Sequence, residues 1–394
     1  MREEEIVIVS AVRTAIGRYG GTLKDSNSGY LASAVIQEAI SRAELSPEQV
    51  DEVILGEVRQ TTKSSNVARV AALRAGLPAE TPGYTINRLC ASSLQAVASG
   101  AQQIMTGQGD IIVAGGTENM SDAPHYLRNA RFGGTPKLVD SNTENGQQPM
   151  EIYGEELGMG KTAENVAERY NILREDQDAF ALQSQEKAKN AQKAGIFDEE
   201  IVPVSVREKK ETKLFTVDEH PRPFTTIDKL KNLKPAFKKG GTVTAGNACG
   251  RNDGAAALLL MSRSKAQELG IKPMAKITGW SVAGVDPEVM GVGPIPAVQK
   301  LLKQTGESLN NIGRIELNEA FASQALAVIR ELSLPAEKVN VNGGAIALGH
   351  PLGATGARIL TTLLYELKRS DEKKGIATLC VGGGQGMAMM VETI

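Results

Sequence analysis

Short apolar runs alternate with amphipathic segments along most of the chain, and this pattern predicts strands that alternate with helices. The run at residues 6–12 is continuous enough for a buried strand, whereas residues 29–43 place Leu31, Val35 and Ile40 on one face of a helix. Further strands are predicted at residues 50–55, 84–86, 110–116, 255–261, 275–283, 314–317, 339–342, 376–380 and 387–392. Further helices are predicted at residues 66–75, 90–105, 297–304, 322–332 and 353–369. Alternation of this kind is typical of a layered α/β fold.

Residues 120–247 interrupt this alternation. Stretches rich in glycine, asparagine and proline surround two predicted helices, at residues 162–170 and 174–194, and basic segments follow at 207–213 and 229–239. We interpret this region as a loop or lid domain inserted into the α/β body. The predicted organisation is an N-terminal α/β half formed by residues 1–119 plus 248–270, a lid at 120–247 and a C-terminal α/β half at 271–394.

The two α/β halves share a sequence pattern. Five positions match at one constant spacing, namely Ser46, Val50, Val53, Leu55 and Glu57 with Ser308, Ile312, Ile315, Leu317 and Glu319. Two shorter segments also look alike: Ser99-Gly-Ala101 resembles Thr355-Gly-Ala357, and Ala114-Gly-Gly116 resembles Val381-Gly-Gly383. The pattern predicts a duplicated α/β unit, and duplication would bring equivalent strand edges of the two halves together.

Composition and charge argue against several classes of partner and binding site. The chain has 394 residues, of which 41% are hydrophobic and 23% charged, as in globular proteins. A net charge of −2 creates no field that would gather nucleic acid or an anionic membrane, so neither is an expected partner. The apolar run near the N-terminus is too short for a signal sequence or a membrane span, and we expect a cytoplasmic protein. Three cysteines without a Cys-x-x-Cys pair and three dispersed histidines predict neither a disulfide framework nor a metal site.

Four polar residues follow or end predicted strands: Cys90, Asn318, His350 and Cys380. Ligands of layered α/β proteins bind at that edge of the sheet, so we expect the four side chains to cluster. Cys90 is predicted at the start of a helix, where free N–H groups favour a thiolate. His350 precedes Pro351, which favours extended backbone and an imidazole that can serve as a base.

Each of these residues also has a purely structural interpretation. Cys90 could be a small core residue, His350 a loop residue, and Cys380 with its glycines a turn. His125 and His220 lack any strand-end context and are expected at the surface or in the lid. Gly154 to Thr162 departs by one residue from the phosphate-loop spacing, and the glycines from Gly349 to Gly356 do not fit a dinucleotide fingerprint, so nucleotide chemistry is not predicted.

Four segments taken together resemble the thiolase family. They are Asn-Arg-Leu-Cys90-Ala-Ser-Ser, Asn318-Glu-Ala-Phe, Gly-His350-Pro-Leu-Gly-Ala-Thr-Gly and Cys380-Val-Gly-Gly-Gly-Gln-Gly. With residues 241–247 and 291–296 the resemblance spans essentially the whole chain. It implies a duplicated fold in α-β-α-β-α layers with an inserted lid. It also implies acyl transfer between thioesters of coenzyme A, in which two acetyl-CoA molecules form acetoacetyl-CoA and the reverse reaction cleaves it.

The resemblance assigns roles to individual residues. Cys90 would carry the acyl group, with His350 taking its proton, and Cys380 would remove a proton from the α-carbon of the second acetyl-CoA. Asn318, through a water, and His350 would stabilise the enolate oxygen. The N–H groups of Cys90 and Gly382 would hold the tetrahedral oxyanion.

The lid would bind coenzyme A. Contacts with it are expected from Arg222, Phe237, Ala245, Cys249, Ala320 and Phe321. The predicted binding partners are acetyl-CoA, acetoacetyl-CoA and CoA, with no permanently bound cofactor and no metal. A homotetramer is expected, assembled through the loop at about residues 123–138.

Two residues depart from the biosynthetic pattern of the family: Gly158 stands where a histidine is common, and Cys249 where a serine is common. They leave open a degradative 3-ketoacyl-CoA thiolase that acts on longer chains. A carrier-protein synthase fits less well, because that relative uses one cysteine with two histidines. A protein that binds acyl-CoA without catalysis is the alternative of a different class.

Overall fold

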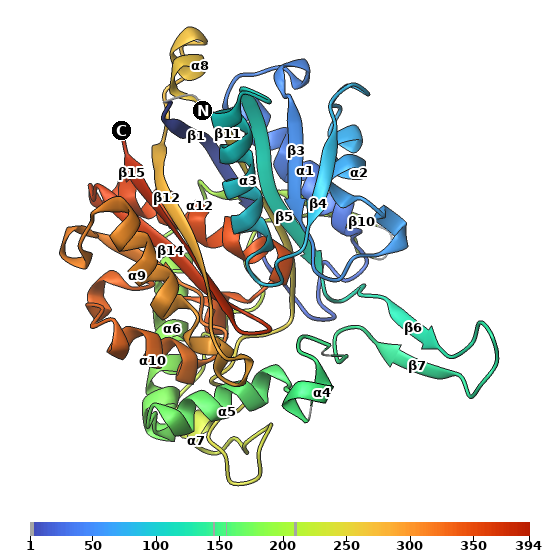
Figure 1. Cartoon of the computed structure of the whole chain (residues 1–394), viewed down its shortest axis with the longest axis vertical. Coiled ribbons are helices and arrows are strands. Elements are labelled where there is room, and N and C mark those ends of the chain that lie inside the picture. Colours follow the sequence, from blue (N-terminus) through green and yellow to red (C-terminus); the bar gives the residue numbers. More distant parts are fainter. Residues whose placement is uncertain (1–3, 145, 155, 209–210) are drawn as a thin grey trace.

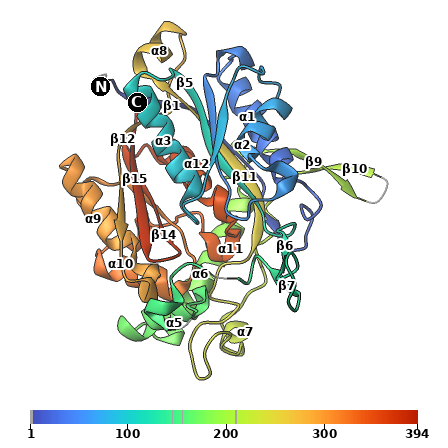
Figure 2. The same cartoon turned by 45° about the vertical axis from the view of Figure 1, so that its right-hand side comes forward.

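The computed structural model describes residues 4–144, 146–154, 156–208 and 211–394. Two sheets and three layers of helices stack in the order helix, sheet, helix, sheet, helix (Figures 1 and 2). The resemblance-based prediction of an α-β-α-β-α fold is therefore confirmed. The lid helices α4 (Met150–Tyr153), α5 (Met159–Arg169) and α7 (Ile227–Lys231) lie at the end of the stack opposite the two chain termini (Figure 1). The lid strands β9 (Val204–Glu208) and β10 (Glu211–Phe215) project instead from the side of the first half (Figure 2).

The two halves of the sheet repeat the same pairing. In the first half β3 pairs in parallel with β5, and β5, β11 and β1 continue in antiparallel order. In the second half β13 pairs in parallel with β14, and β14, β15 and β12 continue in antiparallel order. The strands are β1 (Ile6–Thr14), β3 (Glu52–Gly56), β4 (Gly83–Ile86), β5 (Ile111–Asn119), β11 (Asn252–Ser262), β12 (Ala275–Gly284), β13 (Arg314–Leu317), β14 (Lys374–Val381) and β15 (Gln385–Thr393). A short pairing of β1 with β12 joins the halves, with Val7 opposite Lys276.

Helices cover both outer faces and fill the space between the sheets. Those of the first half are α1 (Ser28–Arg42), α2 (Val67–Arg74) and α8 (Arg263–Glu268) on the periphery and α3 (Ser92–Thr106) in the centre. Those of the second half are α9 (Pro294–Thr305), α10 (Ala322–Glu331) and the short α11 (Ala345–Leu348), with α12 (Thr355–Ser370) in the centre. In Figure 2, α3 and α12 lie between the sheets, with α1 and α2 on one outer side and α9 and α10 on the other.

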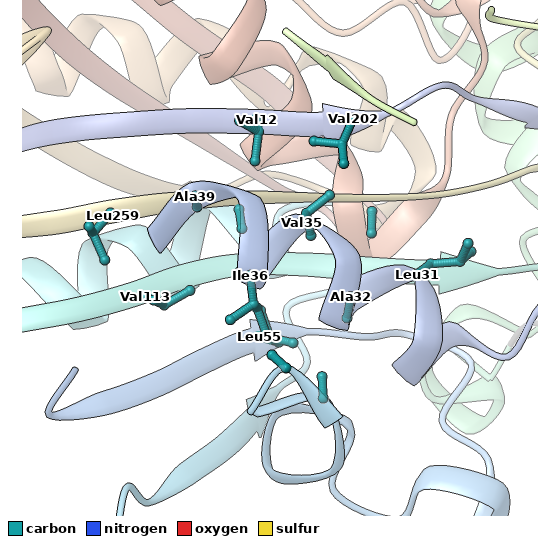
Figure 3. Packing of buried hydrophobic residues seen from close by; sticks show 14 of the residues in the cluster. Val12, Leu31, Ala32, Val35, Ile36, Ala39, Leu55, Val113, Val202 and Leu259 are labelled. Atoms are coloured by element: carbon teal, nitrogen blue, oxygen red, sulfur yellow. The ribbon is translucent and has the colours of Figure 1, made fainter. Parts of the chain in front are cut away.

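Strand β11 shows why its sequence is continuously apolar. Ala257 and Leu259 belong to the core beneath α1, where Figure 3 shows Leu259 among side chains of that helix. Leu258 and Leu260 belong to the central core around α3 and α12. Both faces of the strand are thus buried, and burial of each such side chain contributes about 1.5–3 kcal/mol.

The lid contains more regular structure than its sequence indicates. Helices α4 (Met150–Tyr153), α5 (Met159–Arg169), α6 (Arg174–Lys193) and α7 (Ile227–Lys231) are accompanied by strands β6 (His125–Arg128), β7 (Lys137–Asp140), β8 (Ile201–Val202), β9 (Val204–Glu208) and β10 (Glu211–Phe215). Strand β2 (Gly17–Arg18) belongs to the first half, where it pairs with β11. The β6–β7 hairpin projects far from the body (Figure 1). Neither hairpin was expected. Strands β6 and β7 have no buried residue, and in β10 only Phe215 is buried, although Val204 and Val206 of β9 alternate with exposed residues.

A buried guanidinium anchors the lid to the body. Arg13 of β1 donates to Glu200 Oε1 at 2.6 Å and to the two carboxylate oxygens of Asp218 at 2.7 and 2.9 Å. All three side chains are buried, so each charge depends on its partners for solvation. These contacts hold the lid segments that contain Glu200 and Asp218 against β1 of the first half.

The strand predicted at residues 339–342 is absent. Asn340 adopts a left-handed backbone with φ of 45°, which a continuing strand does not tolerate. Its side chain accepts from the Leu317 N–H at 2.9 Å and donates to the Leu317 carbonyl at 2.8 Å. An amide side chain therefore takes the place of a neighbouring strand beside β13.

The duplication is confirmed in topology but only partly in sequence alignment. The matched segments around Glu57 and Glu319 occupy equivalent places, because β3 and β13 have the same neighbours. The other two matches are wrong: Ser99 lies in the middle of α3 whereas Thr355 begins α12, and Gly116 lies inside β5 whereas Gly382 follows β14. Small residues recur in both halves for packing reasons, so triplets of them align by chance.

The return of β11 to the first sheet after the lid supports the predicted three-part division of the chain, which stays a prediction. Among the helices of the described ranges, none is both long and apolar enough to cross a membrane.

Candidate active site

One cavity of about 460 Å³ gathers most of the predicted site. It lies where the lid meets the ends of the two sheets. Seven predicted residues line it: Cys90, His350, Cys380, Phe237, Cys249, Ala320 and Phe321. The expectation that Cys90, His350 and Cys380 converge is therefore supported by the geometry.

A strained turn presents Cys90. Leu89, directly before it, has a φ of 46°, which costs a residue other than glycine roughly 1–3 kcal/mol. Two side chains hold this turn: Asn87 Oδ1 accepts from the Leu89 N–H at 2.9 Å, and Ser92 Oγ donates to the Leu89 carbonyl at 2.6 Å. Cys90 lies two residues before the first residue of α3, where it lines the cavity and also packs against the central core.

His350 is fixed by a backbone contact and a ring contact. Its N–H donates to Asn252 Oδ1 at 2.9 Å, and its Nδ1 lies 2.7 Å from Thr355 Oγ1. The Thr355 hydroxyl donates its hydrogen bond to the Pro351 carbonyl at 2.8 Å. Nδ1 must therefore be the donor to Thr355, which leaves Nε2 without a proton. Nε2 is buried and has no hydrogen-bond partner among the described residues, as a waiting base requires.

Cys380 and Asn318 lie deeper than the other polar residues. Cys380 is fully buried within β14, one residue before the end of that strand. Asn318 directly follows β13 and is tied to β14 by its backbone N–H, which donates to Thr378 at 3.0 Å. Both atoms of its buried side-chain amide lack partners in the described part of the chain, although Asn318 does not line the cavity itself.

Gly382 contributes its backbone alone. Its N–H and that of Cys90 both act on the Cys90 sulfur and favour its ionised form. A Cβ at residue 382 would overlap the side-chain oxygen of Gln147, so the Gln147 side chain packs closely against this backbone. Two converging N–H groups are the arrangement that stabilises an oxyanion.

Burial dominates the ionisation of the site. It raises the pKa of Cys90 to about 11 in spite of the two N–H groups, and it lowers the pKa of His350 to about 3. Burial, followed by the neighbouring Cys90 and Cys249, raises the pKa of Cys380 well above its usual value. The expected resting thiolate at Cys90 is thus wrong, because desolvation outweighs the helix terminus. The resting site holds neutral thiols and a neutral imidazole.

A second pocket of about 320 Å³ adjoins the cavity and shares with it Ala248, Cys249 and Gly250. Arg222 and Ala245 line this outer pocket and not the cavity. Burial raises the pKa of Cys249, at the junction, to about 12. A long ligand could therefore run from the basic outer pocket past Cys249 to Cys90.

Two ring side chains of the lid are held by specific contacts. Phe237 lines the inner cavity, where its ring meets that of Phe321 edge to face with centroids 6.2 Å apart. His220 is not a free surface residue: its ring packs against Gly250, where any Cβ would overlap it, and burial lowers its pKa to about 4. His125 is exposed at the start of β6, as predicted.

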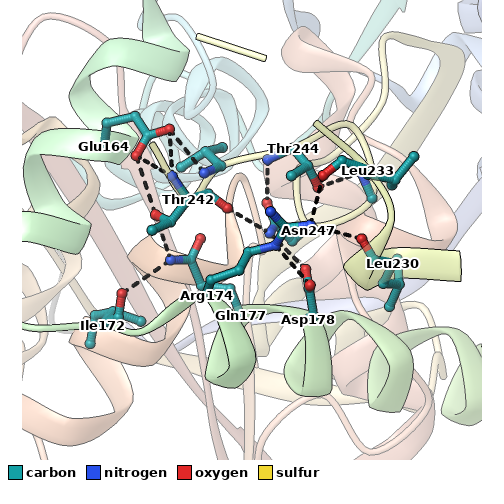
Figure 4. A network of polar contacts seen from close by, with 12 residues as sticks. Glu164, Ile172, Arg174, Gln177, Asp178, Leu230, Leu233, Thr242, Thr244 and Asn247 are labelled. Carbon is teal, nitrogen blue, oxygen red and sulfur yellow. Dashed lines mark hydrogen bonds and ion pairs between the residues drawn. The ribbon is translucent and has the colours of Figure 1, made fainter. Parts of the chain in front are cut away.

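A polar network holds the loop that separates the two pockets (Figure 4). The Glu164 carboxylate of α5 accepts from the N–H groups of Thr242 and Val243 at 2.9 to 3.0 Å. Asn247 donates to Asp178 of α6 at 3.0 Å, and Asp178 is paired with Arg174 at 2.7 Å. The loop at residues 242–247 is therefore held by lid helices and not by the sheet.

Sequence reasoning missed several residues of the site. Thr355 and Asn252, which orient His350, lie within or close to recognised motifs, but nothing in their spacing reveals the contact. Met159 and Met290 line the cavity together with Gln147, and no pattern singles these residues out. Within the described residues there is no cluster of His, Cys, Asp and Glu able to hold a metal ion.

Comparison with known proteins agrees with this geometry over the full chain. The thiolase N-terminal domain matches residues 6–264 and the thiolase C-terminal domain matches residues 271–393. An acetyl-CoA acetyltransferase of Cupriavidus necator is 52% identical over 392 residues, covering 98% of this chain and 99% of that protein. The crystal structure of the Bacillus anthracis acetyl-CoA acetyltransferase superposes with a TM-score of 0.96 at 49% identity and covers 99% of both chains. Human mitochondrial 3-ketoacyl-CoA thiolase in complex with CoA has a TM-score of 0.94 at 44% identity, covering 99% of this chain and 98% of that one.

Proposed function

The chain belongs to the thiolase family, and we propose that it joins two acetyl-CoA molecules into acetoacetyl-CoA and cleaves acetoacetyl-CoA in reverse. One observation carries the proposal: three thiols, among them Cys90 and Cys380, and a neutral imidazole line a cavity that adjoins a basic outer pocket. A thioester needs a soft nucleophile, and carbon–carbon bond formation needs a second base. Acyl-CoA binding without catalysis would require neither.

We propose that the first half-reaction takes place at Cys90. Its sulfur attacks the acetyl thioester while its proton passes to Nε2 of His350, and the N–H groups of Cys90 and Gly382 hold the oxyanion. Because both groups are neutral at rest, the proton moves as the carbon–sulfur bond forms. CoA then departs as its thiol and takes the Cys380 proton.

The second half-reaction uses the Cys380 thiolate. Its raised pKa makes it a strong base once the proton has left, and it removes a proton from the α-carbon of a second acetyl-CoA. The unpartnered Asn318 amide, acting through a water, and His350 would stabilise the enolate oxygen. The enolate attacks acetyl-Cys90, which releases acetoacetyl-CoA and returns a thiol to Cys90.

Coenzyme A would span both pockets. Arg222 and Ala245 would contact its nucleotide end, and Cys249, Phe237, Ala320 and Phe321 would surround the pantetheine arm and acyl group. The lining of both pockets by these residues supports the assignment. The three free thiols suit a reducing compartment, and a cytoplasmic location stays a prediction.

Replacing Cys380 separates the two half-reactions. The Cys380→Ala variant should still form acetyl-Cys90 from acetyl-CoA, because Cys90 and His350 are intact, but should not condense it. Intact-protein mass spectrometry would detect the adduct, and the Cys90→Ala variant is the control that should form none. Condensation at the wild-type rate in Cys380→Ala would refute the role of Cys380. Failure of the wild-type protein to acetylate would refute the enzyme.

Replacing Thr355 tests the orientation of His350. Among the residues that the structure describes, Thr355 is the only hydrogen-bond partner of the His350 ring. Thr355→Val removes this contact, and we expect kcat for acetoacetyl-CoA thiolysis to fall about tenfold, equivalent to about 1.4 kcal/mol. Thr361→Val is a matched control on the same helix, because the buried Thr361 Oγ1 has no hydrogen-bond partner in the described ranges. Equal rates for the two variants would contradict the role of Thr355.

Degradative thiolysis of longer chains is the second candidate function, because the chain is similar to human mitochondrial 3-ketoacyl-CoA thiolase. The preferred acyl chain length distinguishes the two functions. Met159, Met290 and Phe321 occupy the cavity around the thiols, which favours a short acyl group. We expect kcat/KM for thiolysis of acetoacetyl-CoA to exceed that of 3-ketodecanoyl-CoA. The opposite preference would select the degradative function.

A homotetramer remains our proposal for the assembly. The β6–β7 hairpin exposes 59% of Leu127, 95% of Phe132 and 68% of Leu138, an apolar surface that a neighbouring subunit could cover. Changing Phe132 and Leu138 to serine should lower the mass measured by light scattering from four chains to two. Leu214→Ser, on the other projecting hairpin, should leave it unchanged. A wild-type monomer would contradict the proposal.

A further inference from the structure

A buried carboxylate outside the cavity joins the two halves of the site. Glu118 is the penultimate residue of β5, and only 1% of it is exposed. Its carboxylate accepts three backbone N–H groups: from Val58 at 3.0 Å, from Arg59 at 2.9 Å and from Gly353 at 2.8 Å. The first two belong to the N-terminal half, and the third belongs to the segment that carries His350.

The three donors lie beside the reacting groups. Val58 and Arg59 line the cavity with Cys90. Gly353 lies three residues after His350, in a turn of 3-10 helix at Leu352–Ala354. A Cβ at Gly353 would overlap the Thr117 carbonyl, so the His350 segment is pressed directly against the end of the first sheet. Glu118 thus bonds both sides of the seam between nucleophile and base.

We propose that Glu118 is a positioning residue that sets the separation of Cys90 and His350, an inference that rests on the proposed thioester chemistry of this pair. It touches neither sulfur nor imidazole. It acts through two backbone segments: the one that carries His350, and residues 58–59, which line the cavity beside Cys90. The second segment is linked to the turn before Cys90, because Asn87 Nδ2 donates to the Val58 carbonyl at 3.5 Å. Proton transfer from Cys90 to His350 is steeply sensitive to distance, and a displacement of about 1 Å can cost about 100-fold in rate.

The charge of Glu118 argues against a merely electrostatic role. Its negative charge raises the pKa of Cys90 and so opposes the thiolate, although burial is the larger cause. Burial also raises the pKa of Glu118 itself, while its three N–H donors favour the ionised form. Because the Glu118 charge disfavours the Cys90 thiolate, we infer that Glu118 contributes to the site through the geometry that its hydrogen bonds impose.

The neighbouring Glu57 provides a matched control. It is also buried, but within the described ranges its carboxyl accepts only from Ser28 Oγ, at 2.6 Å, and bonds no segment of the site. Burial raises its pKa to about 8, so it is a neutral acid at pH 7 and glutamine reproduces its shape and charge. Glu118→Gln, in contrast, turns an NH₂ group toward backbone donors and loses at least one of the three bonds.

The test compares the wild-type protein, Glu118→Gln and Glu57→Gln in acetoacetyl-CoA thiolysis. For Glu118→Gln we expect kcat to fall about 10- to 100-fold with KM within about twofold of wild type, because the Glu118 side chain lines neither pocket. Glu57→Gln should retain both constants. Wild-type kcat in Glu118→Gln, or a rise in KM that accounts for the lost kcat/KM, would overturn the proposal.

Alkylation of Cys90 by iodoacetamide, followed by peptide mass spectrometry, shows whether Glu118→Gln only displaces Cys90 and His350 relative to each other or unfolds the site. This reaction needs the thiol but not His350, so in Glu118→Gln it should be at least as fast as in wild type, because an opposing charge is gone. Alkylation that slows in parallel with thiolysis would overturn the proposal.

Two further measurements complete the design. If Glu118→Gln does not fold, Glu118→Asp keeps the charge but is one methylene too short to bond both segments, and it should lower kcat with KM unchanged. Wild-type kcat in that variant would likewise overturn the proposal. Acetylation of Cys90 in the wild-type protein reports on the proposed function separately, so a failure of the chemistry is distinguishable from a failure of Glu118 as its positioning group.

Discussion

The close packing of α3 against α12 is the constraint on which the rest of the site depends. At their crossing, Gly356 lies so near Leu94 that a Cβ would overlap it, and the Ala357 N–H donates to Ser93 Oγ at 2.9 Å. Cys90 directly precedes the first helix, and His350 precedes the second by five residues. Because both helices are buried between two sheets, their N-terminal ends cannot move apart without opening the central core. The fold therefore presents a nucleophile and a base at one seam.

Burial brings Cys90, His350 and Cys380 together and also disfavours their charged forms. The same desolvation raises the pKa of the thiols and lowers that of His350, so the resting site stores no ion pair. Charge appears only when substrate binds and protons move, and the converging N–H groups of Cys90 and Gly382 are already oriented to receive it. The lid contributes the outer boundary of this environment. Its anchorage includes buried ion pairs, which join Arg13 of the body to Glu200 and Asp218 of the lid.

Duplication explains why two thiols from distant segments meet. The two halves have the same strand pairing, yet their equivalent acids have diverged. Glu57 accepts one hydrogen bond, whereas Glu319 accepts from Ser184, Asn340 and Ile346 and organises the segment that leads toward His350. Equivalent positions in the two halves thus keep their fold and lose their common role, which is also why alignment of small-residue triplets misled the comparison of halves.

The sequence by itself determined the alternation of strands and helices, the duplicated layers and the convergence of Cys90, His350 and Cys380, because periodic burial and motif order are properties of the linear chain. It could not predict the missing strand at residues 339–342, where an Asn340 side chain substitutes for a strand, or the neutral state of Cys90. Nor could it predict the ring contact of Thr355, the bonds of Glu118 across the seam or the separation of Arg222 from Phe237. Each of these depends on groups far apart in sequence, and only the tertiary structure decides how deeply they are buried and which partners they meet.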